Sequence, residues 1–134
     1  MRLTRRYRFA ASHRLDVPAL GVEENRRLFG KCNNPYGHGH DYILDVTVEG
    51  APDESGQIVR RSALDALVQE RILQRLDHKN LNTDVAELAA RVPTTENVAE
   101  TIREVLEKNW PFAPRLAHVR VAETDRNIFD LELR

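Results

Sequence analysis

Two histidines separated by one glycine, His38 and His40, are the residues of this sequence best suited to metal chemistry. They begin an alternating segment, residues 38–49, that predicts a β-strand. Residues two apart in a strand point to one face, with backbones about 7 Å apart, so both imidazoles can chelate one ion. His13 ends an earlier alternating segment, and strand pairing would bring it beside them. Three imidazoles with an open fourth position are typical of catalytic zinc, although His38 and His40 could instead be partly buried, hydrogen-bonded residues.

The single cysteine, Cys32, lies in a loop beside Lys31 and six residues before His38. A nearby cation or metal lowers the pKa of a thiol and makes the thiolate available as a base or nucleophile. Asp77 and His78 follow a predicted helix and would complete a Cys-His-Asp relay if they meet the thiol in space. The alternatives are an inert cysteine, or a fourth ligand that closes a structural zinc site. Asp77 and His78 could likewise serve only the end of their helix.

The elements that must position these residues follow from periodicity and turn chemistry. We expect strands at residues 3–13, 38–49, 116–124 and 129–134, and helices from Ser62 to residue 76 and from Thr94 or Thr95 to just before Pro111. Ser62 and Asp65 resemble a capping box, and residues 57–59 could extend the sheet. Residues 16–37 predict a long loop with at most a short helical turn. The order ββααββ predicts an α+β fold, a four-stranded antiparallel sheet with two helices on one face.

Length and charge limit the function classes. A chain of 134 residues predicts one domain, residues 1–134, and a net charge of −1 argues against nucleic acid as a partner. No apolar run is long enough to span a membrane, the start lacks the apolar stretch of a leader, and a lone thiol suits a reducing compartment, so we expect a cytoplasmic protein. The open edges and uncovered face of the sheet favour oligomerisation.

Five motifs together resemble the 6-pyruvoyl-tetrahydropterin synthase family. They are FAASHRL at 9–15, GKCNNPYGHGHDY at 30–42, LDHKNLN at 76–82, PTTENVA at 93–99 and VAETDRN at 121–127. The resemblance covers nearly the whole chain, with the motifs in order. It implies the tunnelling fold, in which small antiparallel sheets join into a trimeric barrel that stacks into a homo-hexamer, with active sites at subunit interfaces.

The resemblance also implies roles for residues of this chain. The zinc ligands would be His13, His38 and His40, and the catalytic base Cys32. Asp77 and His78 would complete the relay from an adjacent subunit. The pterin would be anchored by Glu123, with Thr94, Thr95 and Glu96 as companions in its pocket. A carboxylate suits the guanidine-like edge of a pterin because it accepts two parallel hydrogen bonds, as it does from arginine.

The implied substrate is 7,8-dihydroneopterin triphosphate, a small molecule whose phosphates need cations. Arg26, Arg27, Lys31, Lys79 and Arg126 lie near the motifs and are the candidates. No nicotinamide or flavin is needed, because the side chain is oxidised while the ring is reduced.

The family has several branches, which differ in product. One branch is a phosphate-eliminating lyase that forms 6-pyruvoyl-tetrahydropterin, and another is a carbon-carbon lyase of queuosine and deazapurine synthesis that forms 6-carboxy-tetrahydropterin and acetaldehyde. A third, folate-linked branch tends to carry glutamate at the position of Cys32. Five residues separate Cys32 from His38, which resembles the pyruvoyl branch. A zinc-stabilised pterin-binding scaffold without catalysis is the non-enzyme alternative.

Overall fold

The computed structural model describes residues 1–134, and its centre is one five-stranded sheet of order β3-β1-β2-β4-β5. The strands are β1 (Arg2–His13), β2 (His38–Glu49), β3 (Lys79–Asn80), β4 (Arg115–Ala122) and β5 (Ile128–Glu132). The helices are α1 (Val22–Phe29), α2 (Arg61–Val68), α3 (Gln74–Leu76) and α4 (Thr95–Lys108). A π-helical turn, Gln69–Leu73, joins α2 to α3, and short 3-10 turns lie at Gly30–Asn33 and Ala86–Leu88. The α+β class is confirmed.

The pairing of β1 with β2 positions the histidines. The two strands are antiparallel along their full length, with His13 opposite His38 and Ala11 opposite His40. Residues that face each other across a pair share one face of the sheet, so the three imidazoles emerge on the same side. Phe9 and Tyr42 stack next to them on that side with ring centroids 4.8 Å apart.

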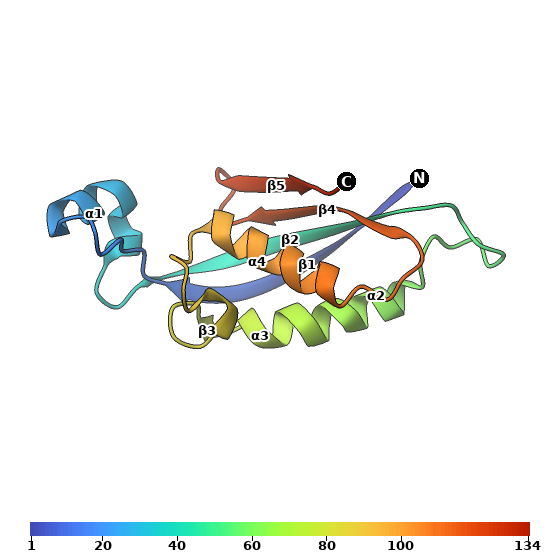
Figure 1. Cartoon of the computed structure of the whole chain (residues 1–134), viewed down its shortest axis with the longest axis horizontal. Helices are drawn as coiled ribbons and strands as arrows, with labels where there is room; N and C mark the ends of the chain where they lie inside the picture. Colours follow the sequence, from blue (N-terminus) through green and yellow to red (C-terminus); the bar gives the residue numbers. More distant parts are fainter.

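The same face carries the hydrophobic core. Fully buried residues of β2, Leu44 and Val46 among them, pack with Leu64 of α2 and Ile102 of α4 in one cluster of 22 buried residues. Figure 1 shows α2, α3 and α4 lying along the sheet, while α1 projects beyond one end of it. Helices on one face are therefore confirmed, but there are three instead of two, because the predicted helix at residues 62–76 is divided by the π-helical turn into α2 and α3. The histidines lie at the end of the core nearest α1.

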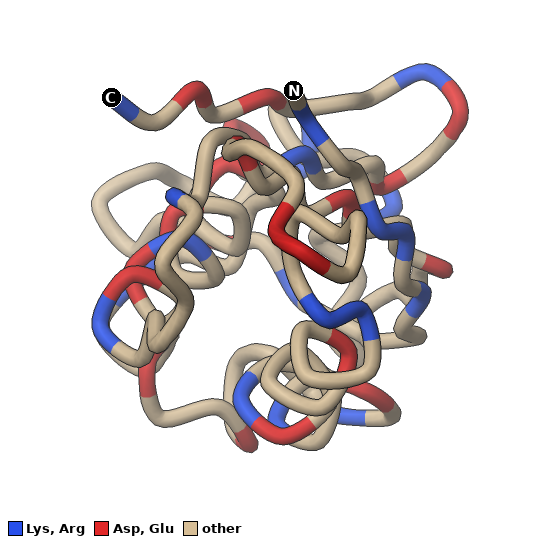
Figure 2. Tube along the Cα trace, turned by 90° about the vertical axis from the view of Figure 1, so that its right-hand side faces the viewer, with Lys and Arg blue, Asp and Glu red and all other residues tan.

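The opposite face is polar, and no helix of the chain covers it (Figure 1). Its side chains bond in pairs across the strands. Arg6 contacts Asp45 through two hydrogen bonds of 2.8 and 3.0 Å, and His118 lies 2.9 Å from Asp130. Figure 2 shows basic and acidic residues interspersed on all sides of the trace. No helix is long and apolar enough to cross a membrane.

Two expectations about the sheet were wrong. The sheet has a fifth strand, β3, which pairs in parallel with β1 at Ala11 and Ser12, so it is neither four-stranded nor wholly antiparallel. Because β3 has only two residues, it is too short to produce an alternating pattern. Residues 57–59 are not a strand and lie in the loop before α2.

The predicted long loop contains a two-turn helix, α1. Its sequence is mostly polar and has no apolar stripe, so periodicity could not reveal it. A buried side chain stabilises it instead: the Asn25 amide accepts a hydrogen bond from Val17 N and donates to the carbonyls of Val17, Leu20 and Gly21.

The two predicted helix starts had different outcomes. Thr94 caps α4, and its hydroxyl accepts a hydrogen bond from Asn97 N at 3.3 Å, which confirms that start. The capping box at Ser62 is wrong, because α2 begins at Arg61 without a side-chain cap. Asp65 instead accepts hydrogen bonds from Arg5 and from the Tyr7 hydroxyl on β1.

Gly37 controls the entry to β2, and we predict that Gly37→Ala is more destabilising than Gly56→Ala. Both glycines have left-handed backbones, with φ of 82° and 81°. A methyl group at position 37 would lie 2.8 Å from the carbonyl oxygen of His13, whereas position 56 is open. Urea unfolding should show a loss of about 1–2 kcal/mol at Gly56 from backbone strain alone, and about 1–3 kcal/mol more at Gly37 from overpacking. Equal losses would show that the approach to His13 is not tight.

Candidate metal centre and active site

Four side chains converge at the edge of the sheet where β1 and β4 end and β2 begins. The ligand atoms of His13, Cys32, His40 and Glu123 all lie within 4.8 Å of one another. We call these four residues the metal group. They come from the end of β1, the 3-10 turn, the start of β2 and the link between β4 and β5. The pairing of β1 with β2 and of β2 with β4 brings the three that lie on or next to strands together. Imidazole, thiolate and carboxylate are all zinc ligands.

His13 carries the clearest sign that an ion fits. Its ring is fully buried, and Nδ1 lies 2.9 Å from the carbonyl oxygen of Pro93. A carbonyl only accepts, so Nδ1 carries the proton and Nε2 keeps its lone pair. That Nε2 has no hydrogen-bond partner. Buried polar atoms are rarely left unpaired, and a backbone carbonyl behind a histidine is the usual support of a metal ligand.

His40 lies at the centre of the group. Its Nε2 is 3.0 Å from Glu123 Oε1 and 3.6 Å from Cys32 Sγ, and its ring centroid is 4.9 Å from that of His13. His38 packs its ring against His40 at 4.8 Å, but it is not one of the four residues whose ligand atoms converge. The structure therefore brings the three predicted histidine ligands side by side, and coordination by His38 stays a prediction.

Burial sets the charge state of the group. It lowers the pKa of His13 and of His40, with the Glu123 carboxylate opposing the shift in both. Both rings are therefore neutral at neutral pH, the form that binds metal. Burial also raises the pKa of the Cys32 thiol, and the Glu123 charge raises it further. The thiol thus needs a nearby cation to become a thiolate.

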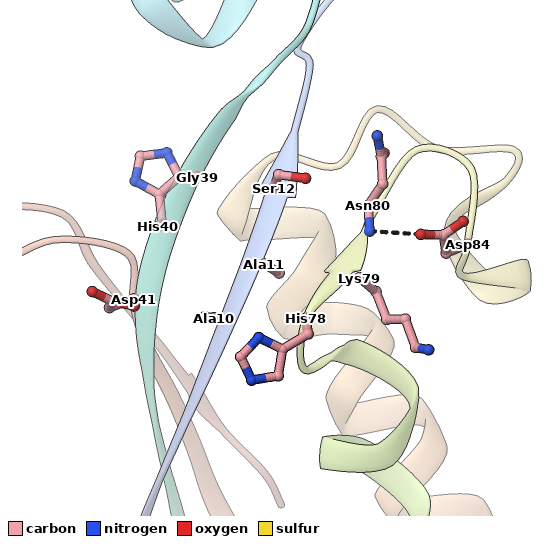
Figure 3. Close-up of a pocket in the computed structure, with 10 residues that line it drawn as sticks. All are labelled: Ala10, Ala11, Ser12, Gly39, His40, Asp41, His78, Lys79, Asn80 and Asp84. Carbon is pink, nitrogen blue, oxygen red and sulfur yellow. Dashed lines mark hydrogen bonds between the residues drawn. The ribbon is translucent and has the colours of Figure 1, made fainter.

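The predicted relay is not assembled within one chain. His78 follows α3 and precedes β3, which borders β1 on the edge away from β2 (Figure 3). Its side chain is 83% exposed, beside a surface cavity of about 530 Å³. Asp77 Oδ1 accepts a hydrogen bond from Ala10 N at 2.9 Å, and Asp77 Oδ2 lies 3.6 Å from His78 Nε2. The two side chains are close but not hydrogen-bonded to each other, and the exposed His78 ring is not one of the groups that converge with Cys32.

The residues proposed to surround a pterin lie at the start of α4, next to His13. Pro93 bonds to His13, so the following residues adjoin the metal group. Thr95 is buried and its hydroxyl has no partner, whereas Glu96 is exposed and forms no ion pair. Their contacts with a pterin stay predictions.

The candidate phosphate-binding cations are all exposed. Lys31 precedes Cys32, Lys79 lines the cavity beside His78, and Arg27 lies 3.5 Å from Glu24. Arg26 and Arg126 form no ion pair. The structure does not select among the five.

Two features of the metal group escaped sequence reasoning. The first is the contact of the Glu123 carboxylate with His40, while the role of Glu123 as pterin anchor stays a prediction. The only signal for that contact is the pairing of β4 with β2, Ala122 opposite Ile43, which cannot be read from the sequence. The second is the space at Gly39, where a methyl group would meet nothing closer than the Ala11 carbonyl oxygen at 4.0 Å.

Comparison with known proteins gives one consistent result. The family model described as 6-pyruvoyl tetrahydropterin synthase matches residues 2–133. The 6-pyruvoyl tetrahydrobiopterin synthase of Homo sapiens is 50% identical over 127 residues, which cover 94% of this chain and 87% of that protein. The Drosophila melanogaster protein of the same name is 42% identical over 127 residues, which cover 94% of this chain and 76% of that protein. The solved structure of Caenorhabditis elegans 6-pyruvoyl tetrahydropterin synthase matches with a TM-score of 0.91 at 35% identity, over 100% of this chain and 96% of that one.

We predict that the chain binds one zinc ion and stays folded when the ion is removed. The metal group lies at the end of the sheet and the core packs without it. Chelation should therefore lower the free energy of unfolding only by the lost binding energy, about 2.7 kcal/mol when free zinc is at a hundredfold excess over Kd. His13→Ala should abolish zinc retention, and His118→Ala is the control because its partner is Asp130. Collapse of circular dichroism on chelation would show a structural zinc site instead.

Proposed function

The chain belongs to the 6-pyruvoyl tetrahydropterin synthase family, and we propose that it converts 7,8-dihydroneopterin triphosphate to 6-pyruvoyl-tetrahydropterin with release of triphosphate. It would act as a zinc-dependent lyase. The observation that carries the proposal is the buried, unpartnered Nε2 of His13 in the metal group, beside the only thiol of the chain. We place the reaction in the cytoplasm, where a lone thiol stays reduced.

Each site residue has its own proposed role in the reaction. His13 and His40, with His38, would hold zinc, which when bound polarises the oxygens of the substrate side chain and so acidifies the neighbouring C–H bonds. The Cys32 thiolate would take a proton from that carbon and return it elsewhere on the substrate. His78 would take the thiol proton and Asp77 would orient its ring. Triphosphate leaves with its electron pair, and the side chain is oxidised as the ring is reduced.

The relay requires a second copy of the chain. His78 is 83% exposed beside the edge strand β3, and we propose that it and Asp77 serve the thiol of another subunit. This agrees with the barrel of sheets that the family resemblance implies. We therefore propose active sites between subunits of a hexamer built as a dimer of trimers.

The length of the loop between Cys32 and His38 supports the choice of product. Five residues separate Cys32 from His38, as in the pyruvoyl branch. The human relative, at 50% identity, also has a pyruvoyl synthase name. Formation of a 6-carboxy product in deazapurine synthesis is the alternative that the same site residues would serve.

The test is the mass of the product after zinc-loaded protein is incubated with 7,8-dihydroneopterin triphosphate. A pyruvoyl product supports the proposal. A carboxy product with acetaldehyde would move the chain to the other branch without changing the site residues. Zinc binding without turnover would favour a pterin-binding scaffold, and Cys32→Ala serves as the inactive control for any product observed.

Two carboxylates should give separable defects. Glu123 is the proposed pterin anchor, so Glu123→Gln should raise KM by about 10-fold or more, because a charge-assisted pair of hydrogen bonds to the pterin is lost. Glu96 is exposed and free of ion pairs, and as a companion of the anchor its change to Gln should raise KM less. Because Glu123 also contacts His40, loss of zinc from Glu123→Gln with an unchanged KM would instead make Glu123 a support of the metal ligands.

Mixing inactive variants tests whether the relay crosses subunits. Cys32→Ala and His78→Ala should each lose most of kcat, since one lacks the base and the other its proton partner. Co-refolded mixed oligomers should regain a fraction of kcat, because some interfaces then combine an intact thiol from one copy with an intact imidazole from another. Each variant refolded alone is the control. Absence of any recovery would place the relay within one chain.

A further inference from the structure

A second asparagine amide is buried where the thiol turn meets the end of β1. Asn33 follows Cys32 directly, and only 6% of the residue is exposed. Its side-chain Nδ2 donates to the carbonyl oxygen of Leu15 at 2.7 Å and to Asp16 Oδ1 at 3.1 Å. Both partners lie within three residues of His13, so the amide joins the thiol turn to the segment that leaves the metal group.

Two further hydrogen bonds complete this junction. Leu15 N donates to the carbonyl oxygen of Cys32 at 2.6 Å, and Arg14 Nε donates to the carbonyl oxygen of Asn33 at 3.3 Å. Both backbone polar groups of Leu15 are therefore hydrogen-bonded, its N–H to Cys32 and its carbonyl oxygen to Asn33. We call the contacts among residues 14–16, 32 and 33 the thiol clamp.

The clamp matters because the intervening segment projects away from the core. Residues 17–31 form the loop and α1 that extend beyond the sheet (Figure 1), and their buried amide, Asn25, bonds only within that segment. The turn itself is closed by local bonds, such as Asn34 N to the Lys31 carbonyl. The Asn33 side chain therefore ties the turn to β1, and with it the position of Sγ, 3.6 Å from His40 Nε2.

We propose that Asn33 is a positioning residue that holds the Cys32 thiol against the metal group. This rests on the proposed function for its catalytic meaning, but the placement of the thiol can be measured without substrate. Asn33 acts through Cys32, not on the pterin itself. Loss of its two hydrogen bonds would leave the Leu15 carbonyl unpaired and loosen the turn, which would then be held only through the carbonyls of Cys32 and Asn33.

The chain offers two matched controls. Asn34 is the next residue, is exposed and makes no side-chain hydrogen bond, so Asn34→Ala tests a change of composition in the same turn. Asn25 is equally buried and amide-bonded but lies in the projecting segment, so Asn25→Ala tests general loosening. Asn33→Asp accompanies Asn33→Ala, because it keeps the size of the side chain, removes both donors and repels Asp16.

The first measurement is the rate at which iodoacetamide alkylates the zinc-loaded protein. Cys32 is the only cysteine, so the rate reports this thiol alone. We expect alkylation several-fold faster in both Asn33 variants, because a half-buried thiol becomes accessible, with zinc content unchanged. Asn34→Ala and Asn25→Ala should match the wild type. A wild-type rate in the Asn33 variants, or the same acceleration in Asn25→Ala, would overturn the proposal.

The second measurement is turnover in single and double variants. Asn33→Ala should lower kcat about 10–100-fold with little change in KM, since a thiol displaced by about 1 Å loses its alignment. In the Cys32→Ala background the same change should have no further effect. A further loss there would show that Asn33 acts elsewhere. Faster alkylation in a protein whose wild type has no turnover would support the thiol placement while rejecting the proposed function.

Discussion

The antiparallel pairing of β1 with β2 is the constraint on which the site depends. Their register places His13 opposite His38 and Ala11 opposite His40, so the small alanine leaves room for the central imidazole. A slip of one residue would move every side chain of one strand to the other face and separate the histidines. The buried aromatic and aliphatic residues farther along β2 hold that register, because they can reach the helices only from one face. Core packing thus sets the geometry of a polar site at its end.

The helix layer contributes to the metal group through backbone atoms. The cap of α4 at Thr94 fixes where the preceding Pro93 carbonyl points, and that carbonyl selects the tautomer of His13. The free Nε2 is then directed toward His40 and Glu123 instead of toward solvent. A change in the start of α4 would therefore alter the metal group even though no residue of the helix belongs to it. Helix capping and ligand orientation are linked by one hydrogen bond.

Sequence patterns predicted the long strands, both principal helices and the strand pairing that brings His13 beside His38 and His40, because alternation and helical spacing are local and strong in these segments. They failed where tertiary contacts decide. The two-residue strand β3 exists only through its partner Ala11, and α1 depends on the buried Asn25 amide and not on an apolar stripe. Asp65 looked like a helix cap but bonds to Arg5, sixty residues away. Glu123 joins the histidines through a strand pairing that no local pattern records.

The backbone at His78 connects the fold to assembly. It is the one non-glycine residue with positive φ, at 59°, a conformation that costs free energy. Two hydrogen bonds hold the strained turn against β1: His78 N donates to the Ala10 carbonyl oxygen, and Ala10 N donates to Asp77 Oδ1. Within one chain the imidazole that this turn presents is exposed and is not one of the groups that converge with Cys32. The proposed active site between subunits would give this strained and exposed turn a function, since each copy would then hold half of the site ready before the other arrives.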